Sequence, residues 1–74
     1  MKLVPIAMTT NVIKAELLRE RLLAEGLHPV GPHTDSLVTQ WGGEHALRIE
    51  VPKDEVEDAI KIMVDAGFQE LLMP

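Results

Sequence analysis

The stretch "LRIEVPKDEVEDAIKIMVDAG", residues 47–67, decides the fold because it holds a strand pattern followed directly by a helix pattern. Its apolar residues Leu47, Ile49 and Val51 alternate with Ala or charged residues, which is the period of two expected of a strand with one buried face. Pro52 then ends the strand, because proline lacks the N–H that a further ladder bond needs. No other part of the chain predicts a strand so clearly.

A helix is expected after Pro52. Asp54 and Glu57, three residues apart, resemble a capping box at its start, and Gly67 follows its last turn, where a left-handed residue ends helices most easily. One broad face is apolar and consists of Val56, Ala59, Ile60, Met63 and Ala66. The opposite face is charged and consists of Glu57, Asp58, Lys61 and Asp65. Such a helix is expected to pack its apolar face on a sheet.

The first half of the chain has the same order of elements. Residues 1–8 predict a strand, and Pro5 allows two arrangements of it: the strand starts near Ile6, or it carries a bulge. Residues 11–25 then predict a helix, which Gly26 ends.

Two more strand signals follow that helix. Residues 27–30 predict a second strand, and Pro29 and Pro32 favour a sheet edge for it, where a missing donor faces solvent. The pair Gly42-Gly43 separates two β-prone runs, which indicates a hairpin turn leading into the strand of the opening stretch.

Each half of the chain therefore runs from strand to helix to glycine to strand, with "FQELL" (residues 68–72) as the last short strand. Two such units joined by an antiparallel link form βαββαβ. We expect one α+β domain over residues 1–74, with a four-stranded antiparallel sheet and two helices on one face.

The segments "KAELLRERLLAEGLHP" (residues 14–29) and "LRIEVPKDEVEDAIKIMVDAG" also carry a family resemblance, which covers nearly the whole chain. They resemble a prokaryotic family of small, functionally undefined proteins described as signal-transducing. The resemblance implies a ferredoxin-like fold, compared in that family with PII-type regulators, and a regulatory or binding role. The family supplies no catalytic residue to carry over. The chain departs from the family pattern at Pro5 and in the Trp-bearing segment before the third strand.

Composition excludes several classes of function. The chain has 74 residues and no cysteine, which excludes disulfides, iron–sulfur clusters, thiolate zinc sites and cysteine nucleophiles. Its 12 acidic and 7 basic residues leave a net charge of −5, which repels a phosphate backbone, so nucleic acid is not an expected partner. Nowhere do 18 uncharged apolar residues occur together, so we expect a soluble cytoplasmic protein with no membrane segment.

The only tryptophan lies in "VTQWGGEH", residues 38–45, against two glycines. Trp41 has two readings. It fills a small core or an interface between copies, or it contacts a ligand or partner as an aromatic hot spot, with Gly42 and Gly43 allowing the loop to move. A second copy of the chain would satisfy both readings.

The first helix has more apolar residues than one buried face needs. Ala15, Leu18 and Leu22, with Val12, share one face, whereas Ile13, Leu17 and Ala24 form a second stripe. Exposed apolar patches usually mark an interface, and a chain this short gains stability from association. We therefore expect a homodimer with this stripe at its interface; the alternative is that the stripe lies under the chain ends or the long loop.

Weaker site candidates remain. His33 and His45, with His28, Asp35 and Glu44, are residue types that bind metals or transfer protons, but their spacing matches no metal or nucleophile motif. We expect no metal, no cofactor and no enzymatic activity. At the start of the first helix, Thr10 and Asn11 either hold a small anion on free amides or simply cap the helix.

The function favoured by these observations is a small cytoplasmic regulatory module that binds a metabolite or a protein. A structural or assembly subunit without its own ligand is the alternative.

Overall fold

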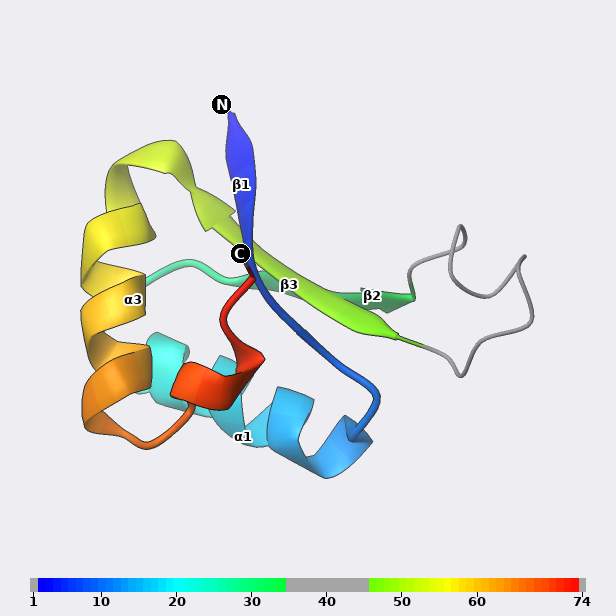
Figure 1. Ribbon diagram of the computed structural model, residues 1–74. Coiled ribbons are helices and arrows are strands. Elements are labelled where there is room, and N and C mark those ends of the chain that lie inside the picture. The colour runs from blue at the N-terminus through cyan, green and yellow to red at the C-terminus, as the bar shows by residue number, and fades with distance from the viewer. Residues whose placement is uncertain (1, 35–45, 74) are drawn as a thin grey trace.

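The computed structural model describes residues 2–34 and 46–73, which form an α+β arrangement. Its helices and strands appear in Figure 1 along the colour gradient from the N-terminus. They are β1 (Leu3–Thr9), α1 (Val12–Ala24), β2 (Val30–Thr34), β3 (Leu47–Pro52) and α3 (Val56–Asp65), with short 3₁₀ helices at Lys53–Glu55 and Gln69–Leu71.

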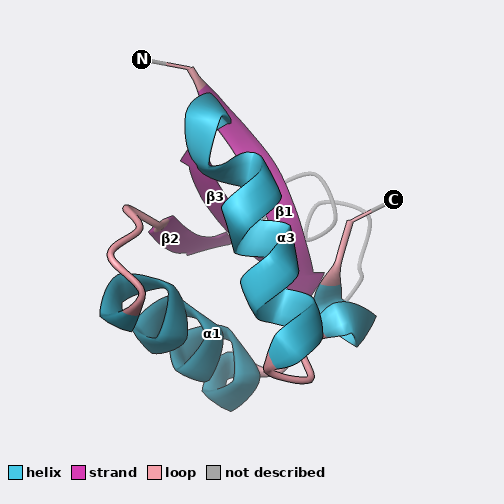
Figure 2. Ribbon diagram, turned by 90° about the vertical axis from the view of Figure 1, so that its left-hand side faces the viewer, coloured by secondary structure: helices cyan, strands magenta, loops and turns pink. Residues whose placement is uncertain are grey.

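The sheet has three strands in the order β1-β3-β2, and both pairs are antiparallel. Figure 2 shows α1 and α3 together on one face of this sheet, as the sequence predicts. The β1–β3 register shifts between Pro5 and Ala7, so β1 carries a bulge and the alternative of a late start at Ile6 is wrong. The bulge leaves Ile6 without a partner, whereas Pro5 pairs with Glu50; β1 is an edge strand of the sheet, where the missing N–H of a proline is tolerated.

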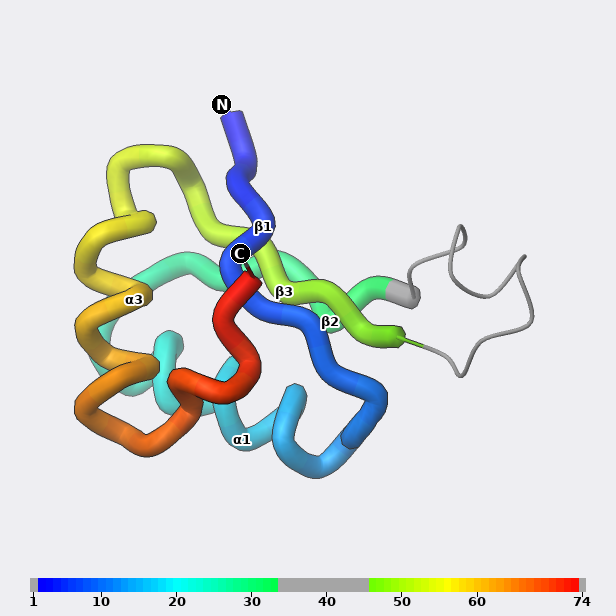
Figure 3. Tube along the Cα trace, viewed as in Figure 1, coloured from blue at the N-terminus to red at the C-terminus, as the bar shows by residue number. Residues whose placement is uncertain are grey.

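The predicted fourth strand is wrong for the described residues. Residues 69–71 form a 3₁₀ turn instead, and only an isolated bridge between Ala7 and Leu72 joins this segment to β1. Phe68 and Leu71 both pack on the core, and residues three apart share a face in a 3₁₀ helix but lie on opposite faces of a strand. Burying both side chains therefore favours the turn. The tube in Figure 3 shows this red segment running beside β1.

Both helices end in the same hydrogen-bonded motif. After α1, the Leu27 N–H donates to the Leu22 carbonyl at 3.0 Å, and after α3 the Phe68 N–H donates to the Met63 carbonyl at 2.7 Å. These bonds close Schellman motifs around Gly26 and Gly67, whose φ angles are 86° and 83°. The predicted helix ends are confirmed. Because Leu27 belongs to a terminator, β2 begins at Val30 and the predicted start at residue 27 is wrong.

The start of α3 differs from the predicted capping box. A 3₁₀ turn of residues 53–55 follows Pro52 directly, and neither this turn nor α3 has a side-chain cap hydrogen bond. Asp54 lies inside this 3₁₀ turn and not at the position that precedes α3. The predicted capping box, in which Asp54 and Glu57 would cap the start of the helix, is therefore wrong.

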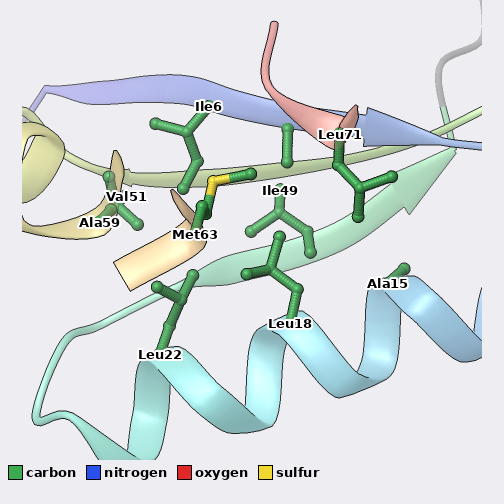
Figure 4. Close-up of a cluster of buried hydrophobic side chains, with 10 residues drawn as sticks. Ile6, Ala15, Leu18, Leu22, Ile49, Val51, Ala59, Met63 and Leu71 are labelled. Atoms are coloured by element: carbon green, nitrogen blue, oxygen red, sulfur yellow. The ribbon is translucent and has the colours of Figure 1, made fainter. Parts of the chain in front are cut away.

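The core lies between the sheet and the two helices, as the close-up in Figure 4 shows. Helix α1 contributes three buried side chains, and the central strand β3 contributes Ile49 and Val51. The complete buried cluster is Ile6, Ala7, Ala15, Leu18, Leu22, Ile49, Val51, Ala59, Met63 and Leu71. Two residues that were predicted on the buried faces of the helices are exposed instead. Val12, the first residue of α1, is 61% exposed, and Ile60, at the border of the apolar face of α3, is 38% exposed.

No helix of residues 2–34 and 46–73 combines the length and the apolar character that crossing a membrane requires.

Truncating Leu18 tests the core. Leu18→Ala is expected to lower the free energy of unfolding by about 2–5 kcal/mol, because the fully buried side chain leaves a cavity between α1 and the sheet. The matched control is Leu23→Ala on the same helix, where the side chain is 47% exposed and the cost should stay below roughly 1 kcal/mol. Urea denaturation followed by circular dichroism measures both, and equal losses would contradict this packing.

Replacing Gly31 tests the β2–β3 pairing. The φ angle of Gly31 is +109°, and an added Cβ would lie 2.7 Å from the Arg48 carbonyl oxygen, so Gly31→Ala must separate β2 from β3. Gly26→Ala is the control, since φ is +86° there but no atom lies within 4 Å of the added carbon. We expect about 1–2 kcal/mol of strain for Gly26→Ala and a larger loss for Gly31→Ala in the same denaturation experiment. Similar losses would refute the close approach.

Candidate functional site

The outward face of α1 carries exposed apolar residues among its charged ones. Ala15, Leu18 and Leu22 cover the sheet, whereas Ile13 is 71% exposed and Leu17 is 51% exposed. Ala24, the third residue of the predicted stripe, is exposed as well. The long loop that could cover this stripe, residues 35–45, lies outside the described residues, as do residues 1 and 74.

A groove runs from this stripe to the end of α3. Leu17 lies in it, and its other lining residues are Glu20, Arg21, Asp65, Ala66 and Phe68. The Schellman motif after α3 positions the last of these, because the Phe68 backbone is bonded to α3 while its ring packs on the core. We call this surface the helix groove. Leu17, Ala66 and Phe68 form its apolar lining, and its charged residues are Glu20, Asp65 and the oppositely charged Arg21.

A second hollow lies along the exposed side of α3. It is lined by Glu57, Asp58, Ile60, Lys61, Val64 and Asp65. Asp65 belongs to both this hollow and the helix groove, so the two form one surface across the helical layer. Three carboxylates and one ammonium surround the apolar pair Ile60 and Val64, which makes this part of the surface acidic. A basic or apolar partner would fit it better than an anion.

The start of α1 is capped by its own residues. The Asn11 side-chain oxygen accepts from the Lys14 backbone N–H at 3.0 Å, and the Asn11 N–H donates to the Thr9 hydroxyl at 3.1 Å. The Lys14 ammonium pairs with Glu70 after α3. Thr10 is exposed and makes no side-chain hydrogen bond with the described residues. Of the two readings of Thr10 and Asn11, this geometry favours capping by Asn11, since its side chain already occupies one free amide.

His28 and Glu55 form a polar staple that sequence reasoning missed. The His28 backbone N–H donates to Glu55 Oε1 at 2.8 Å, and His28 Nδ1 lies 2.6 Å from Glu55 Oε2. The hydrogen bond with the His28 ring, and after it the one from the backbone N–H, lowers the pKa of Glu55, while partial burial acts in the opposite direction. The staple joins the segment after α1 to the start of α3. The residues are 27 positions apart, and no local signal pairs them.

Of the other predicted binding residues, only His33 lies among the described residues. His33 lies exposed on β2, away from His28 and its partner. Residues 2–34 and 46–73 contain no group of three histidines or carboxylates able to hold a metal ion. Trp41, Gly42, Gly43 and His45, together with Asp35 and Glu44, lie outside the described residues.

Comparisons of the chain with protein-family models, curated proteins and solved structures find no match.

The staple predicts a pH dependence of stability. The pKa of Glu55 is lower in the folded protein than in the unfolded chain. Ionised Glu55 therefore stabilises the fold fully at pH values above the unfolded pKa, and this stabilisation is lost as the pH falls through the folded pKa. Glu55→Gln is therefore expected to lose stability at pH 7 and to fall less steeply than the wild type between about pH 5 and pH 3.

Urea midpoints measured at each pH test this expectation. Glu57→Gln is the matched control, because Glu57 is an exposed carboxylate two residues away without the His28 contact. Parallel pH curves for the wild type and Glu55→Gln would show that the staple does not act in solution.

Proposed function

We propose that the protein is a small regulatory or binding module whose helix groove contacts a protein partner. The observation that carries this proposal is the exposure of Ile13 and Leu17 on a helix whose other face already fills the core. Contiguous apolar surface on a small domain usually marks a contact site, because exposing it to water costs free energy unless a partner covers it.

The acidic surroundings of the groove narrow the partner's chemistry. Asp65 lies between the groove and the α3 hollow, where Glu57 and Asp58 add further negative charge. A segment with apolar side chains on one face and basic ones at its flanks would satisfy both features. We propose such a segment, from another protein of the cytoplasm, as the partner.

A binding role is preferred to a catalytic one because three of the polar contacts between described residues have structural uses. Asn11 caps α1, Lys14 ties α1 to Glu70, and Glu55 fastens the segment after α1. None of these pairs lines the helix groove. This supports a site that works by complementary surface rather than by an acid, a base or a nucleophile.

A ferredoxin-like fold is part of the proposal. Two helices on one face of an antiparallel sheet are compatible with it, and the bridge from Leu72 to Ala7 lies beside β1, where a fourth strand would pair. The family resemblance of residues 14–29 and 47–67 points to the same fold and to a signalling role. Neither of these names a ligand.

The alternative is an assembly subunit in which the stripe of Ile13, Leu17 and Ala24 meets a second copy of the chain. The same exposed surface supports it. The two proposals differ in what covers Leu17, so one substitution tests both.

Leu17→Glu is expected to abolish partner binding while leaving the fold intact, because it places a charge on the apolar floor of the groove. The matched control is Leu23→Glu, since Leu23 is 47% exposed on the same helix but does not line the groove. Crosslinking in extracts, followed by mass spectrometry, compares the proteins captured by each variant.

A partner captured by the wild type and by Leu23→Glu, but lost with Leu17→Glu, supports the module. Native mass spectrometry of the purified variants distinguishes the assembly alternative, in which Leu17→Glu lowers the particle mass. If Leu17→Glu and Leu23→Glu behave alike in both measurements, the groove is not a contact site.

A further inference from the structure

Figure 1 shows both helices on one side of the sheet, and no helix or strand of residues 2–34 and 46–73 covers its other face. Its residues follow from the pairing, because partners across a ladder lie on the same face. Arg48 pairs with Met8 and His33, and Glu50 pairs with Pro5 and Val30. We call these residues the open sheet face. Leu3, opposite Pro52, extends it at one end.

Arg48 and Glu50 are incompletely satisfied within one chain. The Arg48 Nε atom is buried and has no hydrogen-bond partner among the described residues, although the Arg48 side chain as a whole is 37% exposed. The nearest carboxylate oxygen, Glu50 Oε1, lies 3.9 Å away, which is too far for a hydrogen bond. The Glu50 side chain is only 17% exposed, so its charge also lies in partly desolvated surroundings. A partner cannot reach the buried Nε atom itself, but the exposed part of the Arg48 guanidinium and the Glu50 carboxylate can each gain from a group of opposite charge.

The arrangement of these two charges is complementary to itself. Arg48 and Glu50 lie two positions apart on β3, so they project from the same face with one on each side of Ile49. A two-fold axis that lies between two stacked sheets, parallel to both and perpendicular to β3, places β3 of a second copy over this face in the opposite direction. The arginine of each copy then meets the glutamate of the other, and the contact forms twice.

We propose that the open sheet face is the contact between two copies of this chain, with reciprocal Arg48–Glu50 ion pairs across it. Pro5, Met8 and Val30 flank the charges and supply apolar surface, which is the usual composition of the centre of an interface. Sheets stacked in this way pack about 10 Å apart.

The two edges of the sheet are less suitable for association than its face. At the β2 edge, Pro32 lacks a backbone donor and the register is irregular between Val30 and His33. At the β1 edge, the bridge from Leu72 and the hydrogen bond from the Met73 N–H to the Ile6 carbonyl occupy part of the strand. The irregular register at the β2 edge and the contacts of Leu72 and Met73 at the β1 edge both hinder the pairing of a further strand with this sheet.

The size of the face sets the expected affinity. Three strands spaced about 4.8 Å apart and about 20 Å long present a surface of only a few hundred Å² per copy. This lies below the roughly 800 Å² per partner of a standard stable interface, so the dimer should be weak and depend on protein concentration. The helix grooves of the two copies face outward from it, which leaves the proposed partner site free.

Charge reversal tests the proposal. Sedimentation at low salt should show the wild type passing from monomer to dimer as its concentration rises. Arg48→Glu and Glu50→Arg each place like charges opposite one another and should raise the dissociation constant at least tenfold. An equimolar mixture of these two variants should dimerise again, because every pair across the interface then has opposite charges. The wild-type dimer should also weaken with added salt.

Several controls keep the outcome decisive. Circular dichroism checks that each variant folds, and Arg48→Gln with Glu50→Gln, which remove charge without reversing it, replace any variant that does not. Leu17→Glu should leave this dimer unchanged, which separates it from contacts of the helix groove. A wild type that stays monomeric at every concentration overturns the proposal and leaves the face to another protein. The proposal is equally overturned if neither Arg48→Glu nor Glu50→Arg changes the dissociation constant of the dimer, or if only Leu17→Glu abolishes the dimer.

Discussion

The alternation of side chains along β3 is the constraint on which the rest of the structure depends. As the central strand, β3 pairs with both other strands, and its Ile49 and Val51 form the floor on which the helices pack. The same period of two directs Arg48 and Glu50 to the other face. A one-residue slip in register would bury these charges and expose the floor. The strand thus creates both the single core and the difference between the two faces.

The Schellman motifs that end α1 and α3 return the chain from each helix to the core. At Gly26 and Gly67 the chain turns in the left-handed conformation, and the next residue bonds back to the helix while its side chain packs on the core. Leu27 and Phe68 therefore hold the ends of α1 and α3 against the core by apolar contacts, at corresponding places in the two halves of the chain. The motif after α3 also limits the number of strands in the sheet. The chain after Phe68 continues as a 3₁₀ turn that buries Leu71 and does not extend into a fourth strand.

A domain with one small core leaves apolar surface on its outside. Helix α1 has apolar residues around most of its circumference, and only the face toward Ile49 is buried. Of the exposed apolar residues of α1, Leu17 lines the helix groove, whereas the open sheet face lies on the other side of the molecule. We infer that the two surfaces serve different partners. The groove offers a hydrophobic floor with acidic flanks to another protein, and the sheet offers paired opposite charges to a second copy.

The sequence by itself determined the parts of this protein that depend on local periodicity and on backbone chemistry. The alternation around Ile49 predicted β3, the apolar spacing of α1 and α3 predicted two helices, and Gly26 and Gly67 predicted where they end. It also identified Ile13 and Leu17 as surplus apolar residues, which the structure places at the surface.

Contacts between distant segments were decided only by the tertiary structure. Whether residues 68–72 extend or turn depends on how Phe68 and Leu71 share the core. Glu55 binds His28, from a segment that no local pattern connects to it. The pairing of Arg48 and Glu50 with residues of β1 and β2 likewise defines a surface that exists only once the strands assemble. Local patterns record the preference of each segment, whereas these outcomes depend on the competition between segments for one small core.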